Sequence, residues 1–255
     1  MKIYLAGCFT KETYEYLKQN HNKYLLQTYY DLKSMKKTKV NSLITCCDEF
    51  LLDSGAFTFM NSGKKVDWKE YIDSYCDFVN EYDIRQLIEL DLDHVVGIEE
   101  TKRIRDYIEK RTKRLPIPVF HRIRGMQYFR DMCKNYPYIA IAASGIVKGV
   151  DEYVKNPNLL RQLLGIAHGY GAKVHGLAYT RLTNINNTTV PFDSVDSTAW
   201  LSGARFGTIY EIRNGAVVQR SSRSRLSGEE INKINLDAWL RIQKEKSKYD
   251  EVWIE

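Results

Sequence analysis

Two segments of the sequence each place a carboxylic acid at the end of a strand-like apolar run. Asp53 follows residues 50–52, and Asp196 lies in residues 192–198. A pair of carboxylates can divide the work at a glycosidic carbon, where one attacks the anomeric carbon and the other moves protons. An isolated Asp-Ser-Gly more often caps the next segment, so the chemical interpretation depends on whether both acids belong to one site.

Other polar residues and glycines also follow apolar runs. They are Ser54, Asp91, Asp93, His121, Arg122, Arg124, Ser144, Gly145, His175, Gly176 and Asp193. Burying several carboxylates together costs free energy, so their convergence at one end of a sheet favours a functional site. Glycines at strand ends allow a flat ligand to approach the backbone amides. A metal site is the rival use of these acids, but their spacing shows no convergent set of ligands, and we predict none.

The elements that must position these residues alternate along the chain. Strand-like segments occur at residues 1–7, 50–53, 86–93, 116–120, 138–142, 172–177, around Asp193 and Asp196, and at 206–212, with mostly helical segments between them. This rhythm predicts an α/β fold, a (β/α)8 TIM barrel, as a single domain over residues 1–255. In such a barrel the carboxyl ends of the strands form one mouth. A doubly wound sheet is the alternative, and no GxGxxG or Walker A motif supports it.

Two helices have clear sequence signals. Asp67-x-x-Glu70 has the form of an N-capping box, and apolar residues recur at helical spacing behind it. Residues 229–248 are expected to form a closing C-terminal helix. An Asn214-Gly215 pair predicts a hairpin-type turn.

The composition bears on the cellular location of the protein. No apolar run is long enough for a membrane span, and the apolar N-terminal stretch is too short for a secretory signal. The 5 cysteines form no C-x-x-C pair, which favours a cytoplasmic location.

The positive charge is concentrated in one part of the chain. The net charge is +6, and the basic segment 205–226 holds one acid, Glu211, against Arg205, Arg213, Arg220, Arg223 and Arg225. Such a cluster is often only a solvated surface, but it also suits the phosphates of a nucleic acid.

Four motifs resemble those of the queuine/archaeosine tRNA-guanine transglycosylases. Residues 53–57, Asp-Ser-Gly-Ala-Phe, resemble the Asp-Ser-Gly-Gly-Phe motif of that family, and residues 195–197 with 202–207 resemble its nucleophile segment. Residues 143–146 are similar to its base-binding turn, and residues 174–177 occupy the place of its next strand end. The motifs occur in the family's order, and the resemblance spans residues 3–207.

The resemblance implies a role for each candidate residue. Asp196 would be the nucleophile that attacks C1′ of a guanosine, and Asp53 the general acid/base. Asp193 is the alternative nucleophile. Asp91 or Asp93, with Asp93 preferred, would read the edge of the base. The other expected substrate-binding residues are Ser54, His121, Arg124, Ser144, Gly145, His175 and Gly176.

The chain also departs from that family. It has no C-x-C-x-x-C zinc motif, and Ala56 and Ser144 stand where glycine is usual. This pattern is closer to the short virus-encoded, DpdA-like branch, which inserts 7-deazaguanine bases into DNA. The resemblance therefore implies nucleic acid as the partner, DNA ahead of tRNA, with a 7-deazaguanine base such as preQ0 or preQ1 and no cofactor.

Several alternatives stay open at the level of sequence. The chain could be a queuine-type tRNA-ribosyltransferase, a nucleoside or glycoside hydrolase on the same barrel, or a catalytically silent nucleic-acid-binding paralogue. The identity of the 7-deazaguanine, and action as a homodimer or with an accessory protein, are also open.

Overall fold

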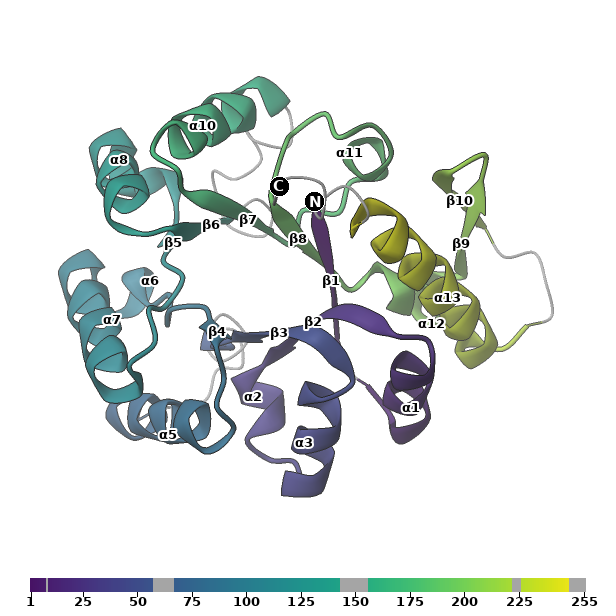
Figure 1. Ribbon diagram of the computed structural model, residues 1–255, viewed down its shortest axis with the longest axis horizontal. Coiled ribbons are helices and arrows are strands. Elements are labelled where there is room, and N and C mark those ends of the chain that lie inside the picture. Colours follow the sequence, from purple (N-terminus) through teal and green to yellow (C-terminus); the bar gives the residue numbers. More distant parts are fainter. Residues whose placement is uncertain (8, 57–66, 143–155, 222–225, 248–255) are drawn as a thin grey trace, which may run out of the picture.

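The structure is a computed structural model that describes residues 1–7, 9–56, 67–142, 156–221 and 226–247 (Figure 1). Ser144, Gly145, Arg223 and Arg225 of the expected site lie outside the described residues.

Eight parallel strands form one sheet, in the order β4-β3-β2-β1-β8-β7-β6-β5. Their bounds are β1 Lys2–Ala6, β2 Asn22–Thr28, β3 Cys47–Asp53, β4 Gln86–Leu87, β5 Val119–Phe120, β6 Tyr138–Ala142, β7 Lys173–Leu177 and β8 Ser194–Ser197. A parallel bridge between Ile88 and Ile117 links the chain beside β4 to the chain beside β5, at the two edges of the sheet. The sheet therefore curls into a barrel, and the predicted α/β barrel fold is confirmed.

Helices surround the strands on the outside (Figure 1). The α-helices are α1 Lys11–Gln19, α2 Tyr29–Leu32, α3 Lys37–Ile44, α5 Trp68–Glu81, α6 Asp93–Val96, α7 Ile98–Thr112, α8 Gly125–Asn135, α10 Pro157–Gly169, α11 Leu182–Asn187, α12 Ser202–Phe206 and α13 Gly228–Ser247. Two 3-10 turns are η1 Arg122–Arg124 and η2 Ala199–Leu201. The capping prediction is confirmed, since the Asp67 carboxylate accepts a hydrogen bond from the Glu70 N–H at 3.1 Å.

The alternation of side chains along each strand creates two cores. One apolar cluster fills the barrel and includes Tyr4, Leu26, Leu51 and Val119. A larger cluster lies between the strands and the helices. Because residues two apart share a face, Asp53 points inward with Leu51, at the carboxyl end of β3.

Two expected strands differ from the structure. Residues 206–212 were expected to complete the barrel, but β2 takes that place, and β9 Thr208–Arg213 pairs antiparallel with β10 Ala216–Ser221. The predicted turn at Asn214-Gly215 joins β9 and β10. A turn this short can connect only antiparallel neighbours, whereas a parallel barrel strand needs a crossover. The hairpin instead packs against α13 and α11 outside the barrel.

The expected strand over residues 86–93 is also shorter in the structure. It ends at Leu87, and Asp93 begins the helix α6. Asp91 and Asp93, which both fall within the expected strand, therefore lie beyond its end, and Asp93 lies in a helix.

Gly55 forms the turn that ends β3. Its φ is +71°, and a Cβ added there would lie 2.6 Å from the Tyr30 Cβ of α2. In contrast, Gly165 lies within α10, and a Cβ there would meet nothing within 4 Å. The two glycines therefore offer a matched pair of substitutions.

We expect Gly55→Ala to lower the free energy of unfolding by about 2 kcal/mol, because alanine disfavours the left-handed conformation and the added methyl group clashes. Gly165→Ala should raise it by about 0.5–1 kcal/mol through helix propensity. Urea unfolding of both variants measures the difference. A Gly55→Ala variant as stable as the wild type would contradict the described turn.

Candidate functional site

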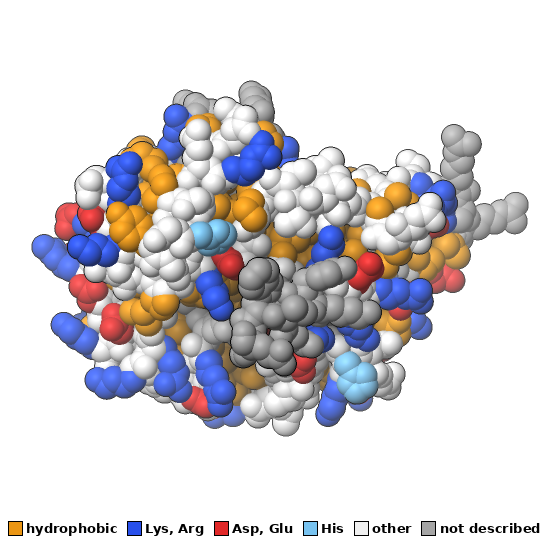
Figure 2. All heavy atoms as spheres, turned by 45° about the horizontal axis from the view of Figure 1, so that its top comes forward, with side chains coloured by type: hydrophobic (Ala, Val, Ile, Leu, Met, Phe, Trp, Pro, Cys, Tyr) orange, Lys and Arg blue, Asp and Glu red, His pale blue; other side chains and the backbone are white. Residues whose placement is uncertain are grey.

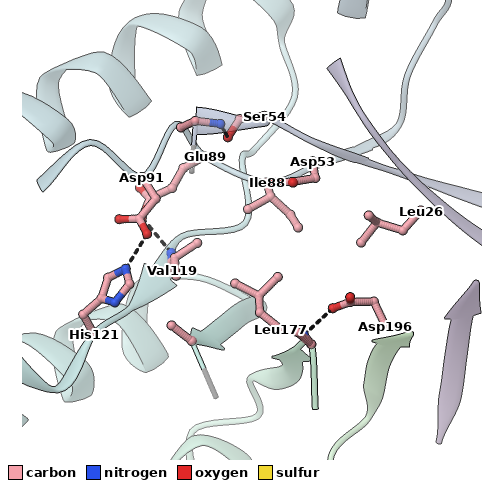
Figure 3. A pocket seen from close by; sticks show the side chains of 13 residues that line it. Leu26, Asp53, Ser54, Ile88, Glu89, Asp91, Val119, His121, Leu177 and Asp196 are labelled. Atoms are coloured by element: carbon pink, nitrogen blue, oxygen red, sulfur yellow. Dashed lines mark hydrogen bonds and ion pairs between the residues drawn. The ribbon is translucent and has the colours of Figure 1, made fainter. Parts of the chain in front are cut away.

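The carboxyl ends of the strands enclose a cavity of about 230 Å³. Side chains and loops from β2, β3, β5, β6, β7 and β8 surround it (Figure 3). Its lining consists of Leu26, Asp53, Ser54, Ala56, Ile88, Glu89, Asp91, Val119, His121, Ala142, Leu177, Ala178 and Asp196. The cavity thus brings together both acids that the sequence singled out.

Asp53 has an altered acidity at this cavity. Burial raises the pKa of its carboxyl to about 7, and the negative charges of Asp196 and Asp91 act in the same direction. Backbone N–H groups of Gly55 and Ser54 act against this rise. A carboxyl with a pKa near neutrality can both donate and accept a proton under physiological conditions.

The turn that carries Asp53 is fixed by hydrogen bonds. The Tyr71 hydroxyl donates to the Ser54 carbonyl at 2.6 Å, and the Ala56 N–H donates to the Ser54 Oγ at 3.4 Å. Ser54 therefore lines the cavity, while its polar atoms shape the turn.

Asp196 is held by donors from β7 and the residue after it. Its Oδ1 accepts a hydrogen bond from the Ala178 N–H at 2.6 Å and lies 3.3 Å from His175 Nε2. Ala178 has a φ of +52°, which is uncommon for a residue with a side chain. Among the described residues, Oδ2 of Asp196 accepts no hydrogen bond.

A buried ion cluster forms the opposite wall. Glu89 is fully buried and accepts hydrogen bonds from Arg105 at 2.9 Å, from Arg124 at 3.2 Å and from the Val119 N–H at 2.7 Å. Burial raises the pKa of Glu89, although both guanidinium groups oppose this. Because each charge has a partner, the cluster can remain within the protein interior.

Asp91 and Asp93 both contact this cluster, but only Asp91 reaches the cavity. Arg124 binds both oxygens of Asp93 and donates to Asp91 at 3.1 Å. Asp91 also bonds to His121 Nε2, and these two residues line the cavity whereas Asp93 does not. The geometry thus reverses the preference for Asp93, and the Arg124 side chain is buried behind the wall, where it orients the acids.

His175 and Gly176, near the end of β7, were expected to bind the substrate, but they lie behind the cavity wall. His175 is fully buried behind Asp196, and a Cβ on Gly176 would lie 3.0 Å from the Phe192 ring. Neither residue lines the cavity, and their neighbours Leu177 and Ala178 do.

The expectation that Asp193 is an alternative nucleophile is wrong in position. It precedes β8, so it lies at the amino end of that strand, opposite the mouth. Its Oδ2 lies 2.9 Å from His168 Nε2 and accepts the Val174 N–H at 2.7 Å.

The basic segment is divided among several places. Arg205 is exposed on α12, close after β8. Arg213 and Arg220 lie on the hairpin, where both form ion pairs with Glu211, at 2.8 and 2.5 Å. Figure 2 shows lysine and arginine side chains spread over the displayed face, without a single continuous patch.

Several residues that line the cavity were not predicted from the sequence, and two of them, Leu26 and Ala178, show why. Leu26 was missed because β2 was not recognised as a strand. Ala178 was missed because its contribution is a backbone N–H, which no residue type signals.

Two searches of the described residues gave negative results. No group of three or more His, Cys, Asp or Glu side chains there is arranged to hold a metal ion. None of the helices in the described part of the chain has the length and apolarity to cross a membrane.

Comparison with known proteins bears on the fold. Neither a protein-family model nor a curated protein sequence matches the chain. Its structure is similar to that of a putative fructose-1,6-biphosphate aldolase from Coccidioides immitis, with a TM-score of 0.55, 9% identity, and coverage of 97% of this chain and 88% of that one.

Two further solved structures are more distant. One is L-talarate dehydratase from Polaromonas sp. JS666, with a TM-score of 0.43, 13% identity, and coverage of 94% of this chain and 63% of that one. The other is a mandelate racemase/muconate lactonizing enzyme from the same organism, with a TM-score of 0.44, 12% identity, and coverage of 92% of this chain and 62% of that one. At these identities the likeness concerns the fold alone.

The raised pKa of Asp53 predicts a pH-dependent stability. Between about pH 4 and pH 7 the folded protein keeps a proton that the unfolded chain releases, so stability falls as pH rises through this window. We expect Asp53→Asn to be more stable than the wild type at pH 8, by about 2 kcal/mol, with no such gain at pH 4.

Thermal unfolding of both proteins at the two pH values measures this difference. Asp196→Asn is the companion variant, because removal of its charge should lower the pKa of Asp53 and reduce the pH dependence. An Asp53→Asn protein equally destabilised at both pH values would contradict the burial described here.

Proposed function

We propose that the protein is a transglycosylase that exchanges guanine in nucleic acid, with DNA favoured over tRNA, for a 7-deazaguanine base. The proposal rests on one observation in particular. Two acids in unlike environments, Asp53 and Asp196, face one cavity from the ends of β3 and β8. Pairs of acids whose surroundings separate their acidities are typical of acid/base and nucleophile assignments.

The environment of Asp196 suits a nucleophile. The Ala178 N–H and the His175 ring contact Oδ1, and Oδ2 remains available to attack C1′ of the target guanosine. In this step the C1′–N9 bond breaks, a C1′–O bond to Asp196 forms, and the guanine leaves with the bonding electrons.

The environment of Asp53 suits a proton carrier. With a pKa of about 7, a protonated Asp53 can give its proton to the departing guanine. The resulting carboxylate then takes the N9 proton of the incoming 7-deazaguanine, whose N9 attacks C1′ and expels Asp196. Two displacements at one carbon retain its configuration, and the protons balance over the cycle.

The cavity size supports a small planar ligand. Its volume of about 230 Å³ is below the range of about 300–1,000 Å³ common for drug-sized ligands, which favours a single heterocyclic base. The Asp91–His121 pair on the wall offers polar atoms to the edge of such a base.

The surface near β8 supports a nucleic-acid partner. Phe206 is 79% exposed beside the exposed Arg205, on the short helix α12 that follows β8. A base must leave its stack to enter the cavity, and an exposed aromatic ring beside a cation suits contacts with bases and phosphate. To bind phosphate, Arg213 and Arg220 would have to give up their ion pairs with Glu211.

The test is release of radiolabelled guanine from DNA and, separately, from tRNA, by the purified full chain with preQ0 or preQ1. We expect release from DNA, coupled to incorporation of the added base, and a loss of at least about 1,000-fold in Asp196→Ala because the covalent route is removed. Asp53→Asn should also lose most activity.

Asp193→Asn is the matched control, because this acid lies at the other end of the same strand, and it should retain exchange. Release of guanine without an added base would identify a hydrolase. Release of guanine from tRNA alone would identify tRNA, and not DNA, as the substrate. The absence of release from both polymers would contradict the proposal.

A further inference from the structure

A chain of hydrogen bonds runs behind Asp196 through the barrel interior. His175 Nε2 lies 3.3 Å from Asp196 Oδ1, and His175 Nδ1 lies 2.5 Å from the Ser194 Oγ. The Ser194 hydroxyl also bonds to the Tyr138 hydroxyl. The four side chains therefore link the candidate nucleophile to the interior near the amino end of β6.

The strand geometry explains why these residues meet. Ser194 and Asp196 are two residues apart on β8, so they share the inward face and are separated by about 6.6 Å along the strand. His175 is the register partner of Ser194 on the neighbouring β7. Its imidazole has one nitrogen at each side and spans the distance between the two β8 side chains.

The donors in this chain have one consistent direction. An ionised Asp196 can only accept, so His175 Nε2 carries the hydrogen. If the imidazole is neutral, Nδ1 then accepts from the Ser194 hydroxyl, and Ser194 accepts from Tyr138. In this arrangement each hydroxyl donates toward the next residue, and the bond at Nδ1 supports the tautomer that the carboxylate requires at Nε2.

The surroundings leave the His175 ring little freedom. The residue is fully buried, and the Tyr4 ring packs against it edge-on with a centroid distance of 5.8 Å. A fixed ring with a fixed tautomer fixes the orientation of the carboxylate that it contacts.

We propose that His175 is a positioning residue, which Ser194 and Tyr138 hold in its Nε2–H tautomer so that Asp196 presents Oδ2 to the substrate. The catalytic consequence rests on the proposed function, whereas the tautomer does not. If the Ser194 hydroxyl were absent, Nδ1 would lose its hydrogen-bond donor, and Asp196 alone would hold the ring in the Nε2–H tautomer.

The first test is nitrogen NMR of ¹⁵N-histidine-labelled protein at pH 7 without substrate. We expect His175 to be an Nε2–H imidazole in the wild type, and we expect its Nδ1 signal to shift in Ser194→Ala because Nδ1 loses its hydrogen-bond donor. The His175 signals are assigned by their loss in His175→Gln or by their proximity to the Tyr4 ring. A wild-type His175 that is Nδ1–H or doubly protonated would overturn the inference.

The second test compares the kinetics of base exchange. Ser194→Ala and Tyr138→Phe should lower kcat, about 10- to 100-fold for Ser194→Ala, and leave KM within about 2-fold, because orientation and not binding is lost. His175→Gln, whose amide can donate to Asp196, should retain more activity than His175→Leu. Equal activity of the Gln and Leu variants, or a change confined to KM, would overturn the positioning role.

The matched control is His168→Gln. His168 forms a His–Asp pair with Asp193, at the end of β8 that lies away from the mouth. It should leave kcat and KM within about 2-fold of the wild type. The two proposals can be contradicted independently. A wild-type protein without exchange activity would contradict the proposed function, and the NMR result would still decide the tautomer of His175.

Discussion

The burial of two carboxylates at one end of the barrel is the constraint on which the site depends. Asp53 and Asp196 lie around one cavity, where two neighbouring negative charges with little water cannot both be stable without compensation. The protein provides that compensation unequally. Asp196 receives the Ala178 N–H and the His175 ring, whereas the pKa of Asp53 rises to about 7. One acid is thereby suited to attack and the other to proton transfer.

Other charged groups inside the barrel also have partners. Glu89 lies between Arg105 and Arg124, and Arg124 extends the ion cluster to Asp91 on the cavity wall. The interior also carries a hydrogen-bonded group of Lys2, Tyr4, Glu49 and Gln86. Such paired networks avoid the large cost of an unpartnered buried charge, and they fix side-chain orientations that apolar packing alone would leave freer.

Sequence reasoning found the fold and the two central acids because both depend on short-range patterns. An apolar run followed by Asp53 or Asp196 directly indicates a strand end. The errors arose where a shift of a few residues changes the environment of a side chain. Asp193 lies three residues before Asp196 but at the opposite end of β8. Asp93 is only two residues beyond Asp91, yet Asp91 lines the cavity and Asp93 does not. Residues 206–212 were placed in the barrel instead of β2, although the Asn214-Gly215 turn was a local signal of an antiparallel hairpin.

The most direct measurement is the search for a covalent intermediate. The protein is mixed with a guanine-containing DNA duplex without a 7-deazaguanine, denatured at low pH and analysed by intact-mass spectrometry and peptide mapping. We expect an adduct with the mass of the DNA minus one guanine, attached through the peptide that holds Asp196 and absent in Asp196→Asn. An adduct on another residue, or guanine release with no adduct under any quench, would contradict the assignment of Asp196 as the nucleophile.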